Sequence, residues 1–212
     1  MVLIALLCAS ICGQSLPGTM TRLTAKLESP EIPKDSFAAQ PKRMYRAGNK
    51  FCRIEENADL AHGIHGLMII SEPDVWMVNQ LDKTARHMVD TGPTFNCRMP
   101  IFATAGDVKS SDDLKQLVQL EFGRELNYFR SRSGPPSPGP VLRGKSTKVY
   151  SVENGDVQLF LFTDGDPEAP VSVVKTRDKS REIIWYGEYM EVPFDAKMLA
   201  RPEGVKIDEV EP

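Results

Sequence analysis

Short runs of alternating apolar and polar residues recur along the chain and predict β-strands. In residues 20–27, Leu23, Ala25 and Leu27 fall on one face of such a strand. Further short runs follow, separated by turn residues such as Gly48-Asn49, and they cover residues 42–47, 50–56, 65–71, 75–80 and 83–89. Runs this short and this evenly spaced indicate an antiparallel meander.

Two of these runs are apolar at every position rather than at every second one. They are residues 67–70, with the sequence Leu-Met-Ile-Ile, and residues 75–78, with the sequence Val-Trp-Met-Val. A strand with two apolar faces is covered on both sides. We therefore expect helices, a second sheet or a bound apolar ligand on each face of this part of the sheet.

The pattern predicts one main helix, which covers one face of the sheet. Ser110 or Ser111 caps its start, and Asp112 and Asp113 suit the positive end of the helix dipole. Gly123 weakens its middle by about 1 kcal/mol relative to alanine. Apolar residues at helical spacing form its buried stripe: Leu114, Leu117, Val118, Phe122, Leu126 and Phe129.

The second half of the chain is again β-rich after a proline-rich stretch. Four prolines in residues 131–145 predict a surface loop without regular ladder pairing, which either separates two domains or makes a long excursion from one. Strands are expected after it, with Asn154-Gly155 as a hairpin turn, at residues 147–152, 157–163, 171–176 and 182–190. We prefer a single domain over residues 16–212. Its fold class is mainly β (α+β).

The first residues predict export. Residues 2–12 are apolar and small, and no charged side chain precedes Arg22. This run is shorter than the roughly 20 residues that span a bilayer, but it has the length of a secretory signal, which we place at residues 1–15. Cys12 lacks the residues expected before a lipidated cysteine. The alternative is a buried amino-terminal strand or helix of an intracellular protein.

After removal of the signal, Cys52 and Cys97 remain. An oxidising compartment permits a disulfide between them, which would restrain the unfolded chain by about 4 kcal/mol in the chain-entropy model. The alternative is two unpaired thiols buried as small apolar groups. We expect the disulfide.

Composition and charge exclude some of the possible classes of function. The hydrophobic fraction is 41%, the net charge −3 and the sequence pI about 5.7. Nucleic-acid-binding proteins usually carry a basic surface, so no nucleic-acid partner is expected. No transmembrane span is expected after the signal.

Known catalytic motifs do not occur in the sequence, and we predict neither a catalytic residue nor a cofactor. His62 and His65 lie three residues apart, but a zinc site needs three or four ligands, and His87, Asp90 or Cys97 would have to complete it. We therefore predict no metal site and interpret the two histidines as part of a polar turn.

Large apolar side chains are the candidates for binding a ligand, because pockets for small ligands are mostly apolar. The candidate lining residues are Met68, Trp76, Leu117, Phe122, Phe160, Phe162 and Trp185. Since the strand register is unknown from sequence, each of them faces either a cavity or the solid core.

Three stretches give the sequence a family resemblance. Residues 44–55 look like a hairpin with a Gly-polar turn, residues 74–80 with Lys83-Thr84 look like the next hairpin, and residues 198–207 resemble a closing segment with Pro-x-Gly. In this order they resemble the bacterial LolA/LolB-like periplasmic lipoprotein carriers. The resemblance implies a strongly curved open antiparallel sheet, or half-barrel, with helical structure on its concave side and acyl chains bound between them.

The leading hypothesis is an exported, non-enzymatic protein of the bacterial periplasm or extracellular space that binds an apolar ligand, either a lipid or a lipoprotein acyl chain. The second is a structural or interaction module of the cell envelope with a solid core. The third is a metal-dependent enzyme.

Overall fold

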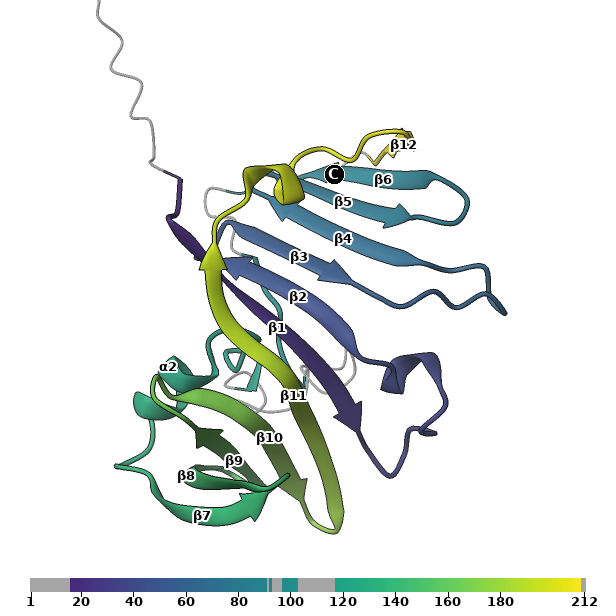
Figure 1. Cartoon of the computed structure of the whole chain (residues 1–212). Coiled ribbons are helices and arrows are strands. Elements are labelled where there is room, and N and C mark those ends of the chain that lie inside the picture. The colour runs from purple at the N-terminus through teal and green to yellow at the C-terminus, as the bar shows by residue number, and fades with distance from the viewer. Residues whose placement is uncertain (1–15, 91, 93–96, 103–116, 211–212) are drawn as a thin grey trace, which may run out of the picture.

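The computed structural model describes residues 16–90, 92, 97–102 and 117–210. Within these residues, twelve strands form a single sheet (Figure 1). They are β1 Thr19–Glu28, β2 Lys42–Ala47, β3 Phe51–Glu55, β4 Gly66–Ser71, β5 Asp74–Asn79, β6 Thr84–Val89, β7 Ser137–Leu142, β8 Lys145–Asn154, β9 Val157–Asp164, β10 Ala169–Arg177, β11 Ser180–Pro193 and β12 Lys206–Glu209. The mainly β character and the antiparallel meander predicted from sequence are confirmed.

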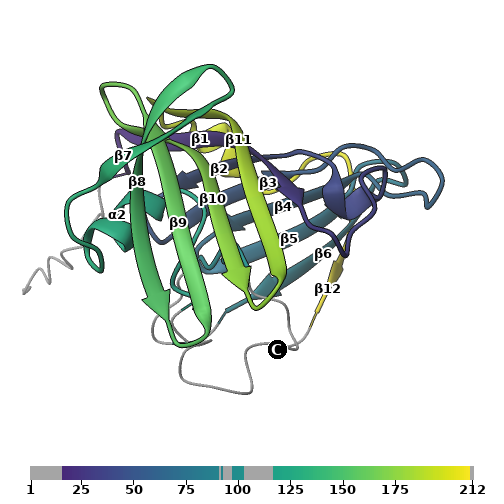
Figure 2. The same cartoon turned by 90° about the horizontal axis from the view of Figure 1, so that it is seen from below.

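The strand order explains the shape. It runs β12-β6-β5-β4-β3-β2-β1-β11-β10-β9-β8-β7, and every neighbouring pair is antiparallel except β12 and β6. Two meanders are therefore joined where β1 pairs with the 14-residue β11. The sheet bends along this pair, and Figure 2 shows β8–β11 in front of β2–β6 with α2 (Glu125–Arg130) on one side. The two ends of the order do not pair, so the sheet stays open.

The main hydrophobic core fills the space inside the bend. Leu159, Leu161 and Val173 enter it from β9 and β10, Leu23 enters from β1, and all four are fully buried. Phe129 of α2 lies in the same cluster. Burial of a side chain of this size contributes about 1.5–3 kcal/mol, so this shared core holds the two meanders together.

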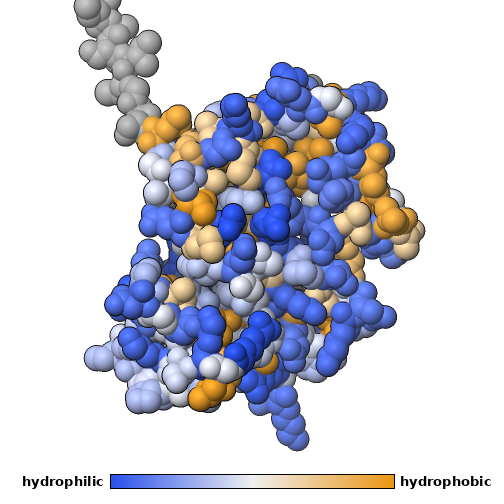
Figure 3. Space-filling model, in the orientation of Figure 1, coloured by the Kyte–Doolittle hydropathy of each residue, from blue (hydrophilic) through white to orange (hydrophobic). Residues whose placement is uncertain are grey.

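The outer face of the first meander is covered by the end of the chain. Leu67, Ile69 and Trp76 pack there with Val205 and Ile207, which follow the 3-10 helix η3 (Ala196–Leu199). Another short 3-10 helix, η1, spans Phe37–Ala39 and contacts β1. Strand β4 is thus covered on both faces, as its apolar sequence predicts, whereas β5 is buried on its outer face but exposes Met77 on the other. On the surface, apolar patches interrupt a mostly hydrophilic exterior in the upper half of the view in Figure 3.

The predicted main helix is wrong in its second half. Gly123 adopts φ +79°, and Glu121 forms a bridge with Pro100, so α2 contains only Glu125–Arg130. A left-handed residue ends a helix, and glycine adopts that conformation without steric cost. The predicted start at residues 110–116 lies outside the described residues, as does the predicted signal at 1–15.

The predicted proline-rich loop is also partly wrong. Residues 137–142 form β7, which pairs with β8 across a register shift between Pro138 and Val141. Because β7 is the last strand of the sheet, it has only one partner to bond, and prolines are tolerated in such a strand. No helix among the described residues is long and apolar enough to cross a membrane.

Candidate functional site

A disulfide ties an inner segment to the sheet. Cys52 of β3 and Cys97 are bonded, with their Cα atoms 6.4 Å apart, as predicted. The Cys97 amide donates to the Asn49 carbonyl at 2.6 Å. Residues 97–102 then pair with residues 117–122 through the bonds from the Ile101 amide to Leu120 and from the Phe122 amide to Met99, both 2.9 Å. We call these two paired segments the inner ladder.

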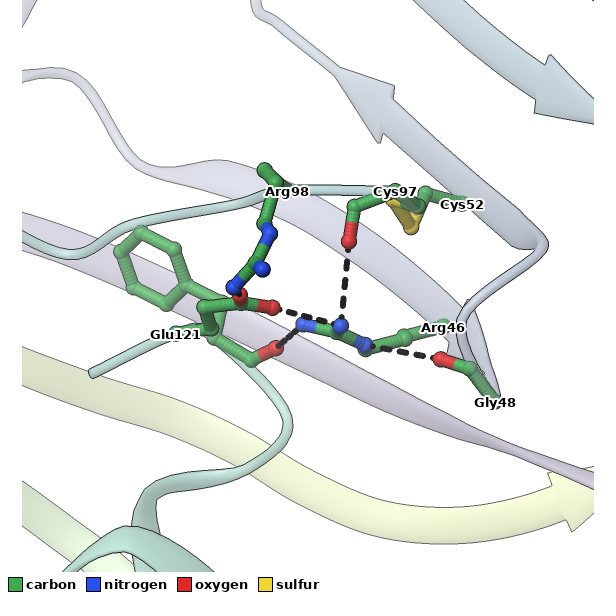
Figure 4. Close-up of a disulfide and its surroundings, with 7 residues drawn as sticks. Arg46, Gly48, Cys52, Cys97, Arg98 and Glu121 are labelled. Atoms are coloured by element: carbon green, nitrogen blue, oxygen red, sulfur yellow. Dashed lines mark hydrogen bonds and ion pairs between the residues drawn. A yellow bond between two sulfur atoms is a disulfide. The ribbon is translucent and has the colours of Figure 1, made fainter. Parts of the chain in front are cut away.

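A buried ion pair fixes the inner ladder in place. Arg46 of β2 lies 2.5 Å from the Glu121 carboxylate, and the exposed fractions of the two side chains are 3% and 2%. The Arg46 guanidinium also donates to the carbonyls of Gly48, Cys97 and Phe122 at 3.0–3.1 Å (Figure 4). Removing one partner of such a pair costs about 3–5 kcal/mol, because the other charge is left buried. Arg46 therefore holds both segments of the inner ladder against the sheet.

An apolar cavity of about 490 Å³ lies between the inner ladder and the first meander. Its floor is a cross-strand row, because Met44, Ile54, Met68 and Met77 are successive partners across β2–β5. Met99, Pro100 and Phe122 of the inner ladder form the opposite wall, and Lys42, Glu56, Gly66, Leu67, Val78 and Arg98 complete the lining. Methionine side chains are flexible and polarizable, so this lining adapts to ligands of irregular shape.

Charged groups sit among this apolar lining. The Lys42 ammonium pairs with the Glu56 carboxylate at 2.6 Å, and Arg98 donates to Glu121 at 2.8 Å. Met77 is 36% exposed, so the row of apolar side chains reaches solvent at β5. The cavity is consequently accessible from outside.

The structure brings together two of the seven candidate lining residues, Met68 and Phe122. Leu117 is part of the solid core, and Trp76 lies on the other face of the sheet, stacked on His87 at 5.2 Å. Phe160 and Phe162 alternate with the core residues Leu159 and Leu161, so they point away from the core.

Ser172 of β10 is the cross-strand partner of both Phe162 and Trp185. Trp185 therefore lies in the same row as Phe162, on the face that points away from the core. Its indole N–H donates to Glu28 at 2.9 Å, and Arg143 lies 4.3 Å from its ring centre. Met44, Ile54, Met77 and Met99 also line the cavity and are not among the residues predicted from sequence. The alternation in β2 and β3 assigns Met44 and Ile54 each to one face of its strand. Their alignment with Met68 and Met77 depends on the strand register, which the sequence does not reveal.

The histidines do not form a metal site in the part of the chain that the structure describes, where no three metal-binding side chains gather. His62 bonds Asp59 at 2.8 Å. His87 lies between Asp74 at 2.8 Å and Glu209 at 2.5 Å. Burial lowers the pKa of His87, but the two carboxylates outweigh it, and the net effect raises that pKa.

A buried acid stands near the cavity wall. Glu125 is fully buried and accepts hydrogen bonds from the hydroxyls of Tyr186 and Tyr189 at 2.7 and 2.8 Å and from the Gly123 amide at 3.0 Å. Burial raises the pKa of Glu125 and the pKa values of both tyrosines. Tyr186 also contacts Phe122 edge to face, so the buried acid supports the residue that closes the cavity.

No family model and no curated protein matches this sequence. Among solved structures, it is similar to an uncharacterised conserved protein from Thermus thermophilus, with 10% identity and a TM-score of 0.50 over 91% of each chain. It also matches a LolA superfamily protein from Nitrosomonas europaea, with 9% identity and a TM-score of 0.41 over 87% of this chain and 90% of that one.

A third match is LprF from Mycobacterium bovis, with 10% identity and a TM-score of 0.38 over 82% of this chain and 85% of that one. At 10% identity, the likeness to the Thermus thermophilus protein shows the fold alone.

Proposed function

We propose that this protein binds a single-chain apolar ligand, a lipid or lipoprotein acyl chain, in the methionine-lined cavity. The observation that carries the proposal is the cavity itself. Its volume of about 490 Å³ lies within the roughly 300–1,000 Å³ of small-molecule sites, and its lining is mostly apolar with a few polar groups. The resemblance of the sequence to lipoprotein carriers implies the same kind of ligand.

The cavity favours this proposal over a solid envelope module. In a module without a ligand, the inner ladder would pack flush on the sheet and leave no space of this size. The disulfide supports export to an oxidising compartment such as the periplasm, because such bonds are rare in the cytosol. We propose a binding protein rather than an enzyme.

A variant that fills the cavity with a larger side chain tests this proposal. Met77→Trp places a bulky ring in the cavity, and the binding of a fluorescent fatty acid should weaken by about tenfold, equal to 1.4 kcal/mol. Met190→Trp is the matched control, because Met190 is 43% exposed on β11 and does not line the cavity. Native mass spectrometry of protein purified from a cell envelope should show co-purified lipid.

Equal affinity of the two variants and the unchanged protein would refute the cavity as the site. If no co-purified lipid is found and no fatty-acid probe binds at micromolar concentration, the proposed function itself is wrong.

A further inference from the structure

A second hollow adjoins the apolar cavity and has the opposite character. Its volume is about 360 Å³, and polar groups dominate its walls. Three arginines contribute to it from the inner ladder, the start of α2 and the residues after α2. Neutral polar side chains complete this part of the lining, which consists of Arg98, Arg124, Arg132, Gln119, Asn127 and Ser131.

The charge in this hollow is not balanced. The one carboxylate among its described lining residues, Glu121, pairs both with Arg98 of the hollow and with the buried Arg46 outside it, so a single negative charge stands among four arginines. Arg124 makes no ion pair with any residue in the described part of the chain. Burial lowers the pKa of Arg124, and so does repulsion from the nearby Arg46 and Arg98, while Glu121 offsets them only in part. An anion placed here would relieve that repulsion.

Hydrogen-bond donors are also available. Arg132 stacks over the Tyr128 ring at 4.1 Å and donates to Gln119 at 2.5 Å, which holds its guanidinium plane at the wall. The Tyr128 side chain is 4% exposed, and its hydroxyl has no hydrogen-bond partner among the described residues. Guanidinium groups match the oxygen geometry of phosphate in two-pronged hydrogen bonds.

The two hollows share a wall. Arg98 lines both of them. Glu121 and Phe122 are consecutive in the inner ladder, and Glu121 lines the polar hollow while Phe122 lines the apolar cavity. One molecule with an apolar chain and an anionic end can therefore reach both.

We propose that the arginine-lined hollow binds the phosphate of an amphipathic ligand whose single acyl chain occupies the methionine-lined cavity. This rests on the proposed function and makes it more specific. The dianionic phosphate would lie among Arg98, Arg124 and Arg132, and the chain would extend past Arg98 over the row from Met44 to Met77.

Calorimetric titrations with three ligands of increasing complexity test the proposal. Inorganic phosphate has the anion alone, monooleoylglycerol has the chain alone, and oleoyl lysophosphatidic acid has both. The phosphorylated lipid should bind about tenfold more tightly than the uncharged one, and inorganic phosphate should bind far more weakly than either.

Variants assign the effect to the hollow. Arg124→Gln should weaken binding of the phosphorylated lipid by about tenfold and leave monooleoylglycerol unchanged. Asn127→Asp, an exposed position in the same hollow, should have the same selective effect by repulsion. Arg181→Gln is the control, because Arg181 is exposed on β11 and lines neither hollow.

Equal affinities for the two lipids, unaffected by Arg124→Gln, overturn this inference and leave the proposed function standing. Inorganic phosphate that binds as tightly as the phosphorylated lipid also overturns it, since the hollow would then be an independent oxyanion site. If neither lipid binds, the proposed function fails together with the inference.

Discussion

At the scale of single residues, the fully buried carboxylates Glu121 and Glu125 are satisfied in two different ways. Glu121 pairs with Arg46, and three carbonyls accept further hydrogen bonds from the Arg46 guanidinium. Glu125 instead has two tyrosine hydroxyls and one amide as partners. Because hydrogen bonds compensate only part of the cost of burying a charge, Glu125 makes stability depend on pH.

We predict that the Glu125→Gln variant loses this dependence. Burial raises the pKa of Glu125 above its usual 4.5, so the folded protein binds a proton more strongly than the unfolded chain does. The stabilisation is full below pH 4.5 and declines as the pH rises through the raised value. Urea unfolding between pH 4 and pH 8 should therefore show the unchanged protein losing stability relative to Glu125→Gln as the pH rises.

Glu203→Gln is the control for this experiment, because Glu203 is exposed. Its difference from the unchanged protein should vary little with pH. A difference between Glu125→Gln and the unchanged protein that is constant across the range would show that Glu125 keeps its ordinary pKa in the fold.

At the scale of elements, the sequence predicts what depends on neighbours along the chain. The hairpins follow from local alternation and turn residues, and the structure places β2 and β3 around Gly48-Asn49 as expected. The helical stripe from Leu114 to Phe129 is misleading because two of its members, Leu117 and Phe122, enter the core without one continuous helix between them. Arg46 is not recognisable from sequence, since its partners Cys97, Glu121 and Phe122 lie 51 or more residues away.

Gly123→Ala separates the helix predicted from the sequence from the observed turn. In a continuous helix the substitution would stabilise the protein by about 1 kcal/mol. At φ +79°, with the added Cβ 3.2 Å from the Arg46 Cδ atom, we expect instead a loss of about 1–2 kcal/mol in the free energy of unfolding, measured in urea.

Gly134→Ala provides the comparison, because a Cβ there meets nothing within 4 Å and the backbone is not left-handed. It should be neutral or slightly stabilising. A stabilised Gly123→Ala variant would contradict the observed turn.

The disulfide gives a second test at this scale. It joins residues 45 positions apart, so its loss in the Cys52→Ala/Cys97→Ala variant should lower the free energy of unfolding by about 4 kcal/mol. Urea unfolding with and without dithiothreitol measures this. Reductant should destabilise the unchanged protein and have no further effect on the double variant. If dithiothreitol destabilises both proteins equally, its effect does not come from reduction of this disulfide.

At the scale of the whole molecule, one pair of strands, β1 and β11, joins two meanders into a single sheet. The open, curved shape implied by the family resemblance is observed, but the β1–β11 pairing that produces it spans most of the chain. The cavity is less predictable still. It depends on the cross-strand register that aligns Met44 with Ile54, Met68 and Met77, and a one-residue slip would turn that row to the other face.

The open ends of the sheet also bear on solubility, because an unpaired strand can recruit a strand from another molecule. At one end, β12 is only four residues long and carries Asp208 and Glu209. At the other, Pro138 and Pro140 in β7 have no N–H to offer an incoming strand. We predict that Pro138→Thr/Pro140→Thr increases self-association in sedimentation velocity, while Pro30→Thr at an exposed turn does not. If the double variant sediments as the unchanged protein does, the prolines are not the barrier. Increased self-association would instead mean that the prolines that make this stretch look like a loop also keep the open sheet from adding strands of other molecules.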